Sequence, residues 1–131
     1  MAAPNIINPT TITGKTTYYT PSGTTAVVLL TNAAASGKVL KINSVVASNI
    51  DGTNAVNATV AYYTNGAVAQ GSAPSGGTAY TVASTISVPA NASLIVVDKS
   101  TQLYIEEGNC LSITSSSANK LTFIVSYEDI S

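Results

Sequence analysis

The sequence predicts an all-β protein: a single antiparallel β-sandwich, jelly-roll-like, with an extended N-terminal arm. Two observations support this. Short runs rich in β-branched and aromatic residues recur at roughly 12-residue spacing between turn clusters, and no stretch has helical periodicity. The length of 131 residues fits one domain. We therefore expect an arm over residues 1–9 and one sandwich domain over residues 10–131.

The arm is predicted because Pro4 and Pro9 exclude a helix and favour extended backbone in the residues before them. Ile6 and Ile7 are large apolar residues without local partners. We expect the arm to dock on a neighbouring subunit, either as an added β-strand or as an apolar anchor.

The first strands are expected over residues 10–13 and 15–19, where Thr, Ile and Tyr dominate. Residues 24–31 form a continuous apolar run, which is typical of a strand buried on both faces. Residues 38–49 alternate, with Leu40, Ile42 and Val46 on one face, and predict a half-buried strand.

Turn signals separate the later strands. Asp51–Gly52 and Asn65–Gly66 favour tight hairpin turns on either side of a strand over residues 56–62. Residues 71–77 form a loop that is flexible by composition. The remaining predictions are an alternating strand through Tyr80, Val82, Ile86 and Val88, a buried run over 94–97, a hairpin of 103–105 with 111–113, and a final alternating strand through Leu121, Phe123, Val125 and Tyr127.

Few residues are charged. The charged fraction is 8%, against about 25% in typical soluble proteins, and the net charge is −1. Such a surface has little repulsion against contact with a neighbour. We expect a homo-oligomer, trimeric or higher.

The composition also argues against several function classes. Five lysines without arginine or histidine give no basic stripe, so we expect no nucleic-acid partner. Without histidine the usual catalytic triads and acid–base groups are missing, so we expect no enzyme and no catalytic residues. The longest apolar run, residues 26–30, is too short to span a membrane, and the first residues do not resemble a signal peptide.

Metal and cofactor sites are not expected either. Cys110 is the only cysteine, so it forms no internal disulfide and cannot hold zinc alone. Glu106 and Glu107 are neighbours whose side chains point to opposite sides of a strand. Asp51 and Asp98 are turn formers, and no calcium-loop pattern surrounds them.

The tyrosines are the best candidates for contact residues. Tyr62, Tyr80 and Tyr127 share the faces predicted for the core. The others are candidates for a subunit interface, because tyrosine is enriched at interfaces; exposed rings could also bind sugars. The interface candidates, together with Ile6 and Ile7, are Tyr18, Tyr19, Tyr63 and Tyr104.

Several segments resemble a known class of proteins. They are the opening residues 1–5 and 10–16, the middle segments 36–43 and 51–55, and the tail segments 94–99, 103–108 and 126–131. Together they resemble small virion structural proteins of tailed phages that infect cyanobacteria and similar hosts. Their motifs are turn and strand signatures.

The resemblance implies a component of the virion, assembled in the host cytoplasm. The expected role is a head decoration or cement protein that contacts the major capsid protein or other virion proteins. A neck or tail component, or a module that binds carbohydrate or the host surface, is the alternative. The resemblance implies no catalytic residue and no cofactor.

Overall fold

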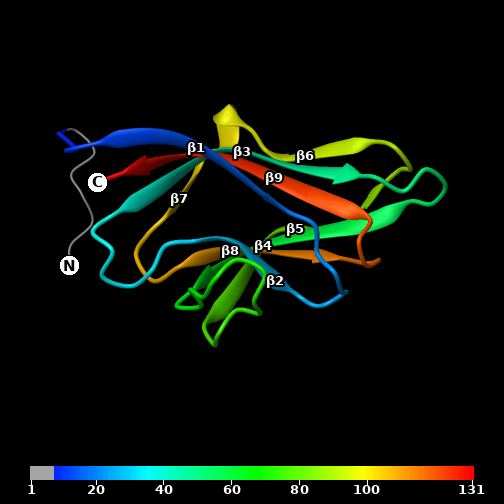
Figure 1. The fold of residues 1–131 in the computed structure, drawn as a ribbon, viewed down its shortest axis with the longest axis horizontal. Helices are drawn as coiled ribbons and strands as arrows, with labels where there is room; N and C mark the ends of the chain where they lie inside the picture. Colours follow the sequence, from blue (N-terminus) through cyan, green and yellow to red (C-terminus); the bar gives the residue numbers. More distant parts are fainter. Residues whose placement is uncertain (1–7) are drawn as a thin grey trace.

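The computed structural model describes residues 8–131 and consists of two antiparallel sheets packed face to face, which confirms the predicted β-sandwich (Figure 1). Sheet A has the strand order β1-β9-β3-β6, with β7 also paired to β3, and sheet B has the order β2-β8-β4-β5. The elements are β1 (Ile12–Tyr19), β2 (Val27–Thr31), β3 (Val39–Asn49), β4 (Val56–Thr64), β5 (Thr78–Val88), β6 (Ser93–Val97), a 3₁₀ turn η1 (Lys99–Thr101), β7 (Leu103–Ile105), β8 (Cys110–Ser115) and β9 (Leu121–Ile130). Ile6 and Ile7 of the predicted arm lie outside the described residues.

The core fills the space between the sheets. Its largest fully buried side chains come from both layers and include Phe123, Leu29, Ile42, Ile105 and Leu111. Burying one side chain of this size stabilises the fold by about 1.5–3 kcal/mol relative to leaving it in water. The core therefore holds the two sheets in one fixed relation.

Strand β9 is the centre of sheet A, because it pairs with β1 on one side and β3 on the other. Leu121, Phe123 and Val125 alternate into the core, as predicted. The two runs expected over residues 10–13 and 15–19 form one strand, β1. Gly14, between them, continues the pairing with β9.

The predicted face of Val46 is wrong. The register between β3 and β9 shifts between Ile42 and Ser44, so one extra residue sits in β3. A β-bulge of this kind reverses the side-chain parity beyond it. Val45 therefore enters the core, and Val46 points to the outer face of sheet A.

Two predicted hairpins are also wrong. Asp51–Gly52 joins β3 in sheet A to β4 in sheet B, and these strands do not pair with each other. The segment 106–109 likewise carries the chain from β7 in sheet A to β8 in sheet B. These short turn sequences therefore form arches between the layers, because β3, β4 and β8 are each paired with other strands on both sides.

Strand β5 is an outer strand of sheet B, and its predicted core face is mostly exposed. Tyr80, Val82 and Ile86 are all exposed, whereas Ala83 and Val88 are buried. Its pairing with β4 shifts register twice, and Thr85 has a φ of 44°. These bulges and the position at the edge break the simple alternation.

Strand β6 was predicted as a buried run and is instead an edge strand of sheet A. Ile95 is 65% exposed, and only Val97 is fully buried. By contrast, Val28, Leu29 and Leu30 of β2 are buried, as the apolar run predicted.

The connection over residues 65–77 explains the burial of β2. Gly71 and Ser72 exchange backbone hydrogen bonds of 2.9 Å with Val28, and the Gln70 side-chain amide donates to the Leu29 carbonyl at 2.9 Å. The first two residues of the loop that composition predicts to be flexible, Gly71 and Ser72, are therefore held against the edge of sheet B.

Candidate functional site

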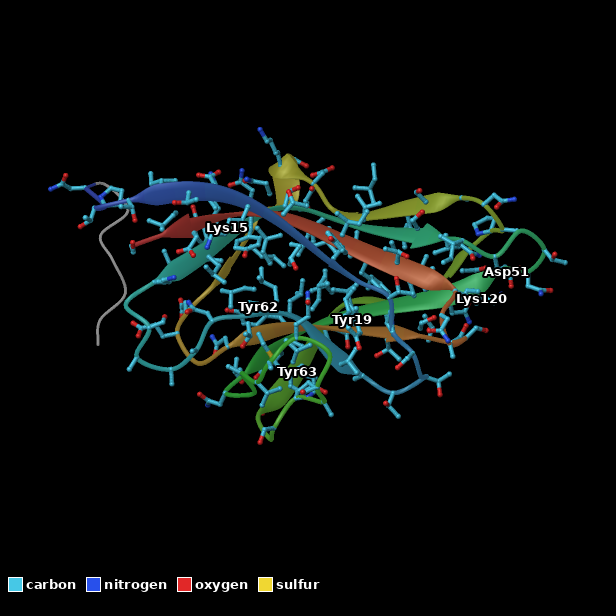
Figure 2. The ribbon with its side chains drawn as sticks, in the orientation of Figure 1. Lys15, Tyr19, Asp51, Tyr62, Tyr63 and Lys120 are labelled. Atoms are coloured by element: carbon cyan, nitrogen blue, oxygen red, sulfur yellow. The ribbon has the colours of Figure 1, made fainter. Side chains whose placement is uncertain are left out.

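The predicted contact tyrosines do not form one cluster. Tyr18 and Tyr104 are exposed on the outer side of sheet A, at 68% and 42%. Tyr19 is half-buried and packs against the core, and its ring fills the space beside Gly71. Tyr63 lies on the outer side of sheet B, away from Tyr19 and Tyr62, which point between the layers (Figure 2).

The outer face of sheet A carries a line of apolar side chains across four strands. Tyr18 on β1 is paired with Ile124 on β9, Ile124 with Val46 on β3, and Val46 with Ile95 on β6. Ile124 is 38% exposed and Ile95 is 65% exposed. We call these four residues, Tyr18, Ile124, Val46 and Ile95, the outer apolar row.

Hydroxyl side chains border the outer apolar row on both sides. One row contains Thr16, Ser126 and Ser44, and the hydroxyls of Thr16 and Ser126 lie 3.3 Å apart. The other contains Thr122, Ser48 and Ser93, extended by Thr20, whose hydroxyl lies 2.9 Å from that of Thr122. No charged side chain stands in these three rows.

Sequence reasoning missed three members of the outer apolar row. Val46 was assigned to the core because the β3 bulge has no obvious sequence signal. Ile95 was placed in a run buried on both faces. Ile124 could have been found, because it interrupts an alternating strand between Phe123 and Val125, where a polar residue would be usual on a solvated face.

The charged residues of sheet A gather at one end of the sandwich. The Asp129 carboxylate accepts hydrogen bonds from Lys15 at 3.0 Å and Lys38 at 3.2 Å, which ties β1 and the start of β3 to β9. Burial raises the pKa of Asp129, but the hydrogen bonds and charges of the two lysines outweigh it, so that the pKa lies below its ordinary value. Figure 2 shows Lys15 at this end and the Asp51–Lys120 pair at the other.

A small cleft of about 240 Å³ opens beside this cluster. Its walls come from the end of β2, the loop to β3 and the end of β9, including Asn32, Lys38, Tyr127 and Asp129. The Asn32 side chain has a structural role, because its amide donates to the Lys38 and Ile105 carbonyls, both at 2.9 Å. The cleft offers hydrogen-bonding groups but no nucleophile with a base beside it.

The other reactive or acidic groups have structural explanations. Burial raises the pKa of the Cys110 thiol to about 11, so it stays protonated and unreactive. Hydrogen bonds from the Thr53 and Asn54 N–H groups hold the pKa of Asp51 below its usual range. Among residues 8–131, no three acidic or cysteine side chains converge as a metal site would require, and no helix is long and apolar enough to cross a membrane.

Comparison with known proteins adds no relative: no family model, curated protein or solved structure matches this chain.

Proposed function

We propose that this chain is a structural protein of a phage virion, most specifically a decoration or cement protein of the head. The observation that carries the proposal is the outer apolar row, which lies with its two hydroxyl rows on an uncharged part of the outer face of sheet A. An exposed apolar strip on an ordered surface is typical of a contact site between proteins. The resemblance of the sequence to virion proteins of tailed phages supports the same role.

The order of the strands supports a jelly-roll interpretation. The chain passes repeatedly from one sheet to the other, and the orders β1-β9-β3-β6 and β2-β8-β4-β5 place the first strand beside the last. Jelly rolls of two four-stranded layers are found in viral capsid proteins. Because one fold hosts many functions, the strand order supports this role less directly than the outer apolar row does.

In this role the partners are the major capsid protein or other virion proteins, and further copies of this chain. The protein acts by covering and joining neighbouring subunits, without catalysis or a cofactor. A location in the neck or tail is the nearest alternative, because the same surface would serve there.

Quantitative mass spectrometry of purified particles of the phage that encodes the chain tests this proposal. A copy number comparable to that of the major capsid protein supports decoration of the head. A low number, matching a single ring, supports a neck or tail position. Absence from the particles overturns the proposal.

A sugar-binding module is a second candidate, and one observation favours it. Tyr80 is 61% exposed on β5 and is paired across the strands with Tyr62, so it could stack on a sugar ring. A glycan array that gives hits lost in the Tyr80→Ala variant would support this function. An array without hits would remove it.

A further inference from the structure

We propose that two copies of this chain associate face to face through sheet A, with the Tyr18–Ile124 part of the outer apolar row forming the centre of the contact. The inference rests on the proposed function only in treating the chain as a subunit of an assembly. It names the surface that one copy uses to bind another.

The surface is suited to a protein contact because its apolar groups are adjacent and exposed. Tyr18 and Ile124 are direct cross-strand partners and are 68% and 38% exposed. They stand on the five-stranded sheet A, whose opposite face is fixed by the core. Covering them removes apolar area from water without reorganising the fold.

The pattern around the row selects a second copy as the partner. The outer apolar row and the two hydroxyl rows beside it contain no charge that an oppositely charged partner could complement. The order hydroxyl, apolar, hydroxyl is also the same when read from either side. A two-fold axis parallel to the strands, between β1 and β9, places each row on its own counterpart, so that apolar meets apolar, hydroxyl meets hydroxyl and no like charges are brought together, as an isologous contact requires.

The turn η1 decides which half of the row is available. Figure 1 shows η1, in yellow, rising above sheet A, and along the chain it directly follows β6, the strand that carries Ile95. Its residues include Lys99 and follow Asp98, so this margin is both raised and charged. The second copy must therefore approach over β1 and β9, which sets Tyr18 of one copy against Ile124 of the other.

The expected contact is small. Overlap over two strands covers less than the roughly 800 Å² per partner of stable complexes. We therefore expect a dimer that forms as the protein concentration rises. A two-fold contact closes at two copies and so differs from the trimer that composition suggested.

The test is sedimentation velocity on the full chain over a range of concentrations, with Ile124→Lys as the disrupting variant. Ile86→Lys is the matched control, because Ile86 on β5 is also a strand isoleucine and is 40% exposed, against 38% for Ile124. We expect a monomer–dimer equilibrium for the wild type, at least tenfold weaker dimerisation for Ile124→Lys and Tyr18→Lys, and no change for Ile86→Lys. Circular dichroism of each variant confirms that it is folded.

Three results would overturn the inference: a wild type that stays monomeric at its highest soluble concentration, a trimer, or an Ile86→Lys variant that loses association as much as Ile124→Lys does. These outcomes are independent of the virion role. A monomer that is nevertheless found in particles removes only this inference, and a dimer that is absent from particles removes only the proposed function.

Discussion

Asn49 holds one of the arches between the two sheets. Its side chain is buried, with 2% exposure, and its amide donates to the Asn54 and Val88 carbonyls, both at 2.9 Å. Its side-chain oxygen accepts from the Asp51 N–H at 2.8 Å. One residue therefore satisfies three backbone groups in two segments, the arch over residues 51–54 and the end of β5 at Val88.

Asn49→Ala is expected to lower the free energy of unfolding by about 2–4 kcal/mol, because it leaves buried backbone groups without partners. Urea denaturation at neutral pH measures this. The control is Asn57→Ala, at an exposed asparagine of β4, which should change stability by less than about 0.5 kcal/mol. Equal losses in the two variants would contradict the assigned role of Asn49.

The lowered pKa of Asp129 predicts that the stability of the fold depends on pH. Its pKa is lowered in the folded state relative to the ordinary value of 3.8, so the unfolded chain binds this proton more readily. The stabilisation is therefore complete above pH 3.8 and is lost as the pH falls through the lower folded pKa. At neutral pH, Asp129→Asn should cost about 1–2 kcal/mol.

Denaturation of wild type and Asp129→Asn at neutral pH and in strong acid tests this dependence. The difference in unfolding free energy between wild type and Asp129→Asn should shrink as the pH falls below the pKa of Asp129 in the unfolded chain. A gap that stays constant into strong acid would show that the carboxylate charge is not what stabilises this end of the sandwich.

At the scale of the elements, the connection from β4 to β5 depends on two adjacent glycines that differ in their surroundings. Both have positive φ, 73° at Gly76 and 77° at Gly77. A Cβ on Gly77 would lie 2.1 Å from the Thr64 carbonyl oxygen, whereas one on Gly76 would meet open space. Gly77 is thus required by both conformation and packing.

Gly76→Ala should cost about 1–2 kcal/mol from its left-handed conformation alone. Gly77→Ala should cost a further 1–3 kcal/mol or so, because the backbone must move to relieve the clash. Thermal unfolding of the pair measures the difference directly. Similar melting temperatures would mean that this turn relaxes freely.

Local patterns predicted some strands well and others poorly. The alternation in β9 predicted which of its side chains are buried, because β9 pairs regularly with β1. The apolar run in β2 predicted burial because both faces of β2 are covered. Val46 was misassigned because the β3 bulge adds a residue without changing the local pattern. The Asp51–Gly52 turn was misassigned because its sequence does not tell which sheet receives the next strand.

The candidate contact surface was predictable only in part for the same reason. Tyr18 and Tyr104 were expected at a contact and are exposed. Ile124, Val46 and Ile95 become neighbours of Tyr18 only through the cross-strand register of sheet A, which four separate segments set together. Single-strand alternation contains no information on that register.

At the scale of the whole molecule, the charges are confined to parts of the surface. Residues 52–97, which include β4, β5 and β6, contain no charged side chain. The residues of the proposed face-to-face contact, Tyr18 and Ile124 with the hydroxyl rows beside them, are equally uncharged. Raising the salt concentration should therefore leave the dimer as stable as before or slightly more stable, since screening has no attraction to weaken. A marked weakening with salt in sedimentation experiments would point to a charged contact instead.

The role that we propose for the chain is that of a component of a phage particle that works through its surface. A cryo-EM reconstruction of the intact head, compared with that of particles lacking the gene, tests it most directly. The account predicts density that fits this β-sandwich at regular positions on the wild-type capsid and is missing from the deletion particles. Identical reconstructions, with no sandwich on the head, neck or tail of either, would contradict it.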